Sequence, residues 1–300
     1  SVDEGGVRSP MIMYAPSLFP SARIIPQISS VMDLFPTLLD IAGLTTEKNK
    51  PLDGQSLLPL LKFKETSWPD RMLVNHWRGK TSIRSQQYRL DAKGQLFDME
   101  SDPGQTEDIA TSYPHVYSRM DSIANVWEAT VLTELPAEDK RPFLIGHPDH
   151  PHTQIPARDG TAHGEIKRSN RWPNCSFFTQ WTTESDSISW DVDVMKEGDF
   201  AVELYYTLPK GCEGVELVLK LGDAELSTQV QQAFDPPLRG MEHDRIPRGE
   251  SYVKNWQSLD MGIVHLPKGS GRLRLTSPRI PGPQGIDFRL VVLHRQKNPA

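Results

Sequence analysis

The sequence predicts an α+β region, with a small antiparallel sheet and a packed helix, followed by an all-β jelly-roll-like sandwich. Two observations carry this prediction. Residues 1–135 mix short apolar runs with amphipathic helical segments, whereas residues 175–300 contain strand-like segments with strict two-residue alternation. The length of 300 residues allows about two domains.

The pattern of the first 70 residues predicts a buried strand followed by helices. Residues 10–16, "PMIMYAP", form an apolar run between prolines, which is typical of a strand buried on both faces of a parallel sheet. Residues 29–43 have serine caps, apolar residues at helical spacing and a terminal glycine, and therefore predict one helix. A turn and a short helical piece follow at residues 52–61.

Residues 71–135 change to short strands and then to one long helix. The segments "MLVNHW", "TSIRSQQYRLD" and "GQLFDM" predict antiparallel strands. The helix should begin near Pro114, with an apolar face formed by Val116, Met120, Ile123 and Trp127. A few strands covered by one helix make a small α+β unit.

Residues 136–174 are rich in proline, histidine, glycine and charge, and they show no periodicity. We expect an extended linker. The linker contains "HPDHPH", residues 147–152, where three imidazoles and Asp149 lie close together in sequence. The prolines keep this segment extended and the sequence offers no partner cluster, so a solvated linker is favoured over a metal site.

Residues 175–300 predict the β-sandwich domain. The strand at residues 187–194 should point Ile188, Trp190, Val192 and Val194 inward, and residues 200–206 repeat the pattern. Similar alternation recurs in "VELVLKL", "GIVHL", "RLRLT" and "IDFRLVVL". Of the tryptophans here, Trp256 is the best candidate for an exposed sugar-stacking ring, although packing is the favoured role.

Composition excludes several classes of partner and scaffold. The net charge is -6 without a long basic stripe, which argues against nucleic acid and against anionic membranes. No apolar run reaches the roughly 20 residues that span a bilayer. Cys175 and Cys212 are too few for a disulfide-dense scaffold or a multi-cysteine zinc site, and whether they pair stays open.

Four segments, in this order, resemble landmarks of the type I, formylglycine-dependent sulfatases of the alkaline phosphatase superfamily. They are "DEGGVRSPMIMYAP", "VMDLFPTLLDIAGL" with "LDGQSLLPLL", "SIRSQQYRLD", and "GQLFDMESDPGQTEDIA". The first is similar to the segment after the active-site lysine of that family. The last two are similar to the family's C-terminal subdomain.

The resemblance implies a domain order. Residues 1–70 would be the end of the sulfatase α/β core, and residues 71–135 the C-terminal α+β subdomain. The linker at 136–174 and the sandwich at 175–300 would follow. The sandwich is similar, more loosely, to the sugar-binding-like domain appended to some bacterial sulfatases.

The resemblance also implies which catalytic groups to look for. Sulfate ester hydrolysis needs a cation for the ester oxygens and an activated nucleophile. In the family these are a calcium ion and a formylglycine made from a C/S-x-P/A-x-R motif. Neither Cys175 nor Cys212 has that motif, and the family's calcium ligands precede the lysine. We therefore expect no catalytic or metal-binding residue here, with calcium and formylglycine belonging to the intact parent, and no turnover by this segment alone.

Five residues remain as candidates for indirect or recognition roles. Glu4 and Arg8 should brace the loop that leads away from the lysine and should not touch substrate. His76, Trp77 and Arg78 follow a strand of the subdomain that overhangs the pocket in carbohydrate sulfatases, so the resemblance makes them candidates for gripping a sugar or a sulfate. The alternative is an ordinary strand end with a packed tryptophan.

The function implied is hydrolysis of sulfate esters of a carbohydrate or aryl substrate, to which this segment contributes scaffold and recognition surface. Two alternatives stay open: a carbohydrate-binding or structural module without chemistry, and a phosphoester or phosphonate hydrolase of the same superfamily. The resemblance favours a periplasmic or extracellular location. The strand at residues 11–14 should lie in a large mixed sheet of the intact enzyme. Without those neighbours we expect residues 1 to about 30 to be disordered, repacked or satisfied by another chain, which would also allow self-association.

Overall fold

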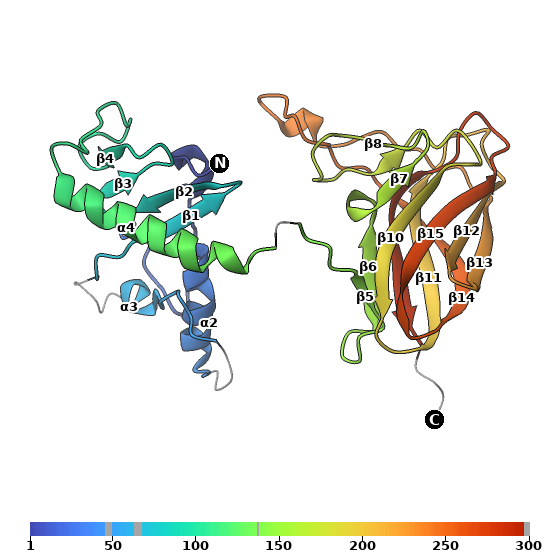
Figure 1. Ribbon diagram of the computed structural model, residues 1–300, viewed down its shortest axis with the longest axis horizontal. Coiled ribbons are helices and arrows are strands. Elements are labelled where there is room, and N and C mark those ends of the chain that lie inside the picture. The colour runs from blue at the N-terminus through green and yellow to red at the C-terminus, as the bar shows by residue number, and fades with distance from the viewer. Residues whose placement is uncertain (46–49, 63–67, 137, 297–300) are drawn as a thin grey trace. The chain divides into compact units, whose positions relative to one another are not determined.

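The computed structural model describes residues 1–45, 50–62, 68–136 and 138–296. The chain divides into two compact units, Ser1–Glu138 and Asp139–Ala300 (Figure 1). Each unit has its own hydrophobic core. The two units are therefore described separately.

The N-terminal unit contains short helices, a four-stranded sheet and one long helix. Its sheet is antiparallel throughout, in the order β1-β2-β3-β4. The helical elements of this unit are α1 (Glu4–Val7), η1 (Val31–Asp33), α2 (Leu34–Ala42), α3 (Leu58–Leu61), α4 (Pro114–Thr130) and η2 (Leu132–Glu134). The strands are β1 (Leu73–Trp77), β2 (Lys80–Arg84), β3 (Tyr88–Leu90) and β4 (Leu96–Asp98).

Helix α4 covers the sheet, as Figure 1 shows, and Met120 is its fully buried contact. Met120 packs with Ile83, Leu90 and Leu96 of the strands. Val116 and Ile123 lie beside this cluster, one helical turn to either side. The small α+β arrangement predicted from the sequence is thereby confirmed.

Helix α2 ends where the sequence predicts. Gly43 is left-handed, with a φ of 64°, and Leu44 donates its N–H to the carbonyl oxygen of Leu39 at 3.0 Å. This bond and the left-handed glycine form the C-terminal cap with which many helices end. The helical piece predicted at 52–61 is α3, which is shorter.

Residues 11–14 form no strand here, and the segment is repacked, as expected for a strand that lacks its sheet neighbours. These residues have no regular secondary structure, and Ile12 and Tyr14 are 91% and 90% exposed. Met13 instead packs, with Phe19 and Ile25, against the buried leucines around α3. The physical reason is that a strand needs neighbouring strands, and no segment in the described residues pairs with this one.

The C-terminal unit is a sandwich of two sheets. The first has the order β13-β12-β15-β10-β5, with β7 also paired to β10. The second has the order β14-β11-β16-β9-β8, with β6 also paired to β16. The strands are β5 (Phe143–Ile145), β6 (His152–Pro156), β7 (Thr161–His163), β8 (Lys167–Arg168), β9 (Phe178–Thr179), β10 (Ser187–Val194), β11 (Gly198–Thr207), β12 (Val215–Leu221), β13 (Ala224–Val230), β14 (Gln257–Leu266), β15 (Gly269–Arg279) and β16 (Asp287–Arg295), with η3 (Ala157–Asp159) and η4 (Met241–His243) between them.

The inward-facing residues predicted for the sandwich form its core. Ile188, Trp190, Val192 and Val194 of β10 are all at most 3% exposed. Alternate residues of β11 are buried in the same way and join the same cluster. This confirms the sandwich, because a period of two buries one face of each strand.

The structure differs from the predicted linker at residues 136–174. Short strands in this range belong to the sandwich: β5 pairs with β10, β7 pairs with β10, and β6 pairs with β16. These strands are too short and too rich in proline and histidine to show alternation. Their hydrogen-bonding partners lie tens of residues away, so local sequence does not reveal them.

The two cysteines are both free thiols, with Cys212 buried and Cys175 half-buried. Across the described residues, no helix has the length and apolar character needed to cross a bilayer.

Candidate functional site

Glu4 lies at the centre of an arginine cluster in the N-terminal unit. Its carboxylate is 3.6 Å from Nε of Arg84, and 3.8 Å from both the Arg8 and the Arg89 guanidinium. Burial lowers the pKa of Arg84, and the negative charge of Glu4 opposes that shift. A carboxylate between three guanidiniums is held in place electrostatically, while the indirect role expected for Glu4 in catalysis stays a prediction.

Arg89 anchors the beginning of the chain to the sheet. Its side chain is only 3% exposed, and Nη2 donates to the carbonyl oxygen of Val2 at 3.1 Å. The Ser82 hydroxyl donates to the same oxygen at 3.0 Å. Helix α1 is too short to be stable alone, so these contacts with β2 and β3 hold it in place. Arg8 is different, since its side chain is 72% exposed.

His76 lies at the end of β1, with both ring nitrogens in use. Nε2 accepts the Gly79 N–H at 3.3 Å, and Nδ1 lies 3.0 Å from the Thr81 hydroxyl. The ring also packs on Trp127 of α4, with 5.5 Å between centroids. These contacts give His76 a role in shaping the hairpin and leave no ring nitrogen free for a ligand.

Trp77 and Arg78 form the exposed tip of the β1–β2 hairpin. Arg78 and Gly79 have positive φ angles of 49° and 73°, the geometry of a two-residue hairpin turn. The Arg78 guanidinium lies 4.8 Å from the centroid of the Trp77 ring, and Trp77 is 45% exposed. Lys80, which directly follows Gly79, is also exposed. The tip therefore presents an aromatic ring and two cations to solvent.

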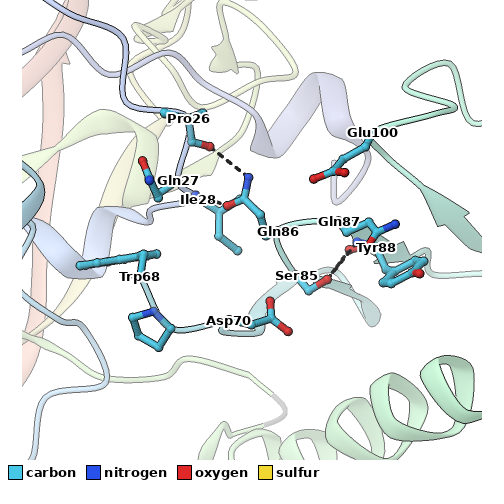
Figure 2. A pocket seen from close by; sticks show the side chains of 11 residues that line it. Pro26, Gln27, Ile28, Trp68, Asp70, Ser85, Gln86, Gln87, Tyr88 and Glu100 are labelled. Carbon is cyan, nitrogen blue, oxygen red and sulfur yellow. Dashed lines mark hydrogen bonds between the residues drawn. The ribbon is translucent and has the colours of Figure 1, made fainter. Parts of the chain in front are cut away.

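A separate pocket of about 490 Å³ lies between the loop at residues 26–28 and the turn at 85–88 (Figure 2). Gln86 ties its walls together, donating to the Pro26 carbonyl oxygen at 3.1 Å and accepting the Ile28 N–H at 2.9 Å. Among the residues that the structure describes, Asp70 and Glu100 are its charged lining residues, and no lysine, arginine or histidine lines it. An acidic lining disfavours a sulfate group here.

The sequence did not single out this pocket. It joins Asp70, the turn at 85–88 and Glu100, which are separate in the chain. None of the five predicted site residues lines it. Residues 81–91 were predicted as strand, so the turn between β2 and β3 that forms one wall was not anticipated.

The residues present do not fit the calcium and formylglycine of the sulfatase resemblance. Within the ranges that the structure describes, no group of three or more histidine, cysteine, aspartate or glutamate side chains converges to hold a metal ion. Cys212 is 1% exposed, so its thiol faces the core. No catalytic step can be derived from these residues.

The aromatic residues of the sandwich occupy mostly structural positions. Trp181 and Trp190 are at most 3% exposed. Trp256 is half-buried and meets Phe177 edge-on, with 5.0 Å between centroids. Lys254 lies beneath both rings and binds Asp235 and Asp287 at 2.8 and 2.9 Å. Trp256 is thus packed, in agreement with the role favoured from the sequence.

Comparison with known proteins links part of this chain to sulfatases. Arylsulfatase D of Homo sapiens is 40% identical over 73 residues, which cover 24% of this chain and 12% of that protein. N-acetylgalactosamine-6-sulfatase of Canis lupus familiaris is 43% identical over 78 residues, covering 26% and 14%. Arylsulfatase K of Mus musculus is 29% identical over 144 residues, covering 40% and 25%. No family model matches the chain.

Solved structures give a looser comparison for about half of the chain. A GH26-CBM35 β-(1,4)-mannanase of Podospora anserina covers 50% of this chain and 28% of its own, with 11% identity and a TM-score of 0.35. A family 35 carbohydrate-binding module of Clostridium thermocellum covers 47% and 96%, with 12% identity and a TM-score of 0.33. Likeness at this level carries no inference about function.

The class is therefore an α+β unit followed by a β-sandwich. More specifically, the chain contains a segment related to the sulfatases. It spans at most about a quarter of the length of these relatives.

Proposed function

We propose that this chain is the C-terminal part of a sulfatase that hydrolyses sulfate esters of a carbohydrate or aryl substrate. In this proposal the chain supplies scaffold and recognition surface, while calcium and formylglycine are held by the rest of the enzyme. The observation that carries the proposal is the partial similarity to several sulfatases. A choline-sulfatase of Rhizobium meliloti is also 32% identical over 116 residues.

The scaffold role is supported by apolar surface on the N-terminal unit. Ile12, Tyr14 and Ile24 are about nine-tenths exposed, and Val31 and Leu38 are 80% and 58% exposed. Single exposed apolar residues are common, but so many large ones in neighbouring segments indicate a surface that another part packs against.

The recognition role rests on the hairpin tip. Trp77 can stack on a sugar ring, and Arg78 and Lys80 can pair with sulfate oxygens. His76 would support the tip through its bonds to Gly79 and Thr81. A sulfated saccharide matches this combination of aromatic face and positive charge better than a neutral one.

Affinity chromatography of the 300-residue chain on sulfated and unsulfated dextran tests the recognition role. We expect retention on the sulfated polymer only. Trp77→Ala and Arg78→Asn should each elute earlier, and asparagine is chosen because it tolerates the left-handed backbone of residue 78. Arg119→Gln, an exposed arginine on α4, is the matched control and should elute with the wild type. Equal retention of all four proteins would rule out the hairpin tip.

Sulfate release tests the enzymatic proposal. The chain alone, with calcium, should release no inorganic sulfate from 4-nitrophenyl sulfate. A longer protein carrying an upstream C/S-x-P/A-x-R motif, made in a host that generates formylglycine, should release it. Faster hydrolysis of 4-nitrophenyl phosphate by that longer protein would favour the phosphoester hydrolase alternative.

A carbohydrate-binding or structural module without chemistry is the second candidate. The sandwich favours it, because its core is continuous and independent of the N-terminal unit. Dextran retention together with an inactive longer protein would support this candidate. For either function we propose a periplasmic or extracellular location, which fractionation of the native host would test.

A further inference from the structure

The histidine-rich segment of residues 147–152 has a partner that the sequence alone did not reveal. His152 begins β6, and His294 lies near the end of β16, directly opposite it in the antiparallel register. The two imidazole rings are stacked, with 3.9 Å between centroids and 15° between ring planes. Both residues are exposed. The fold thus presents two imidazoles to solvent from two strands far apart in sequence.

The backbone explains why these rings are so close. The neighbouring pair is hydrogen-bonded, since Arg295 donates its N–H to the carbonyl oxygen of Pro151 at 2.9 Å. In antiparallel sheets hydrogen-bonded and non-hydrogen-bonded pairs alternate, and the second kind brings side chains closer. His152 and His294 form such a pair. Their proximity is therefore set by the rigid sheet.

The ring nitrogens of these two histidines are available. No hydrogen bond or ion pair within the described residues engages either ring. Several other histidines already use a ring nitrogen: His163 bonds Ser189, His265 bonds Asp199, and Nδ1 of His147 accepts the Asp149 N–H. His76 uses both nitrogens, as described above.

We propose that His152 and His294 form a chelating site for a divalent transition metal ion on the surface of the sandwich. Imidazole suits copper, nickel and zinc. In a site without other constraints, Cu²⁺ binds most tightly among the divalent first-row metal ions. The ring centroids lie 3.9 Å apart with nearly parallel planes, so binding requires both rings to rotate about their side-chain bonds until one nitrogen of each faces the same ion. The net charge of -6 also favours cations.

The site supplies two protein ligands. No third histidine, cysteine or carboxylate joins them in the described residues, so water would fill the remaining positions. Such a site is open and can exchange its metal. Calcium, the ion expected for a sulfatase, prefers oxygen ligands, so this site is independent of it.

Isothermal titration of the untagged 300-residue chain with Cu²⁺ tests the proposal. We expect saturable binding of one ion, with weaker binding of Ni²⁺ and Zn²⁺. His152→Asn and His294→Asn should each reduce the Cu²⁺ affinity at least about tenfold, because removing a ligand costs no less than removing a supporting residue. Electron paramagnetic resonance should show coupling to two nitrogens in the wild type and to fewer in either variant.

Two controls keep this result specific. His115→Asn removes an exposed histidine on α4 and should change nothing. His150→Asn removes the ring that lies 4.9 Å from His147 in the adjacent turn and should leave the Cu²⁺ affinity within twofold. Loss of Cu²⁺ binding in His150→Asn with retention in His294→Asn would overturn the proposal. Absence of saturable binding to the wild type at Cu²⁺ concentrations up to roughly 100 μM would also overturn it, because the dissociation constant would then be too high for a specific site.

Discussion

At the scale of single residues, Asp33 is the most constrained side chain of the N-terminal unit. It is fully buried, and both carboxylate oxygens lie 2.8 Å from Nη1 of Arg71. The same carboxylate accepts the backbone N–H groups of Ser30 and Gln55. One side chain therefore joins the start of α2, the loop before α3 and the segment that leads into β1.

We expect Asp33→Ala to destabilise the N-terminal unit by about 3–5 kcal/mol, because it leaves a largely buried arginine and two backbone donors without their acceptor. Asp40→Ala, at an exposed position on α2, should change stability by about 0.5 kcal/mol or less. Hydrogen exchange read by mass spectrometry, peptide by peptide, separates this unit from the sandwich. Equal exchange in the two variants would contradict the assigned role.

Residue-scale patterns predicted some roles and missed others for a physical reason. The bracing role of Glu4 follows from a local run of charge and glycine. The stack of His152 on His294 joins residues that are 142 positions apart in the sequence and depends on the pairing of β6 with β16. No local pattern encodes such a register. Asp33 was not singled out from the sequence, because its partner Arg71 belongs to a later segment.

At the scale of elements, one lysine ties two parts of the sandwich together. Lys254 precedes β14, its side chain is 9% exposed, and it binds Asp235 and Asp287. Burial lowers the pKa of Lys254, but the hydrogen bonds and charges of the two aspartates outweigh burial, and the pKa is raised overall. The charged form is thus the one that the folded sandwich stabilises.

Lys254→Met should destabilise the sandwich by about 2–3 kcal/mol at neutral pH, since it leaves two carboxylates facing each other without a cation. Lys220→Met is the matched control: Lys220 pairs with Glu225 at 3.0 Å but is half exposed, so its loss should cost about 0.5 kcal/mol or less. Urea unfolding followed by the sandwich tryptophans measures both.

The pH dependence has a definite sign. Because the folded pKa of Lys254 is raised, its contribution is complete below the unfolded pKa of about 10.4 and is lost as pH rises through the folded pKa. The stability gap between wild type and Lys254→Met should therefore be constant from pH 7 to 9 and shrink above about pH 10.5. A gap that shrinks below pH 8 would mean that another group is responsible.

Elements with strong periodicity were predictable, and weakly periodic ones were not. Strands β10 and β12 lie at the residues that their alternation indicates, because each buries one full face. Strands β5 to β8 have two to five residues each and pair mainly at sheet edges. Too few side chains alternate there to distinguish a strand from a loop, so the segment was expected to be a linker.

At the scale of the whole molecule, the apolar surface of the N-terminal unit has a consequence that does not depend on the sulfatase assignment. In residues 11–14, which lack the sheet neighbours expected for a strand, Met13 turns inward while Ile12 and Tyr14 face solvent. Helix α2 likewise exposes Phe35 and Leu38. Surface of this kind is removed from water by whatever apolar partner is present.

We therefore expect the isolated 300-residue chain to self-associate as its concentration rises, measured by sedimentation velocity from 1 to 100 μM. Ile12→Ser with Leu38→Ser should reduce association at least about fivefold, because each loses more than 1 kcal/mol of apolar burial. Val126→Ser, a 60% exposed position on α4, is the control and should associate like the wild type.

The longer protein that carries a catalytic core should behave differently. If that core packs on residues 11–24 and α2, the same surface is already covered, so self-association should disappear and the double variant should instead lower thermal stability. A monomeric wild-type chain at 100 μM would show that these residues are satisfied within the unit itself. If neither the Ile12→Ser/Leu38→Ser variant nor Val126→Ser changes self-association, the contact lies elsewhere. The apolar surface would then no longer support the proposal that a catalytic core packs on it.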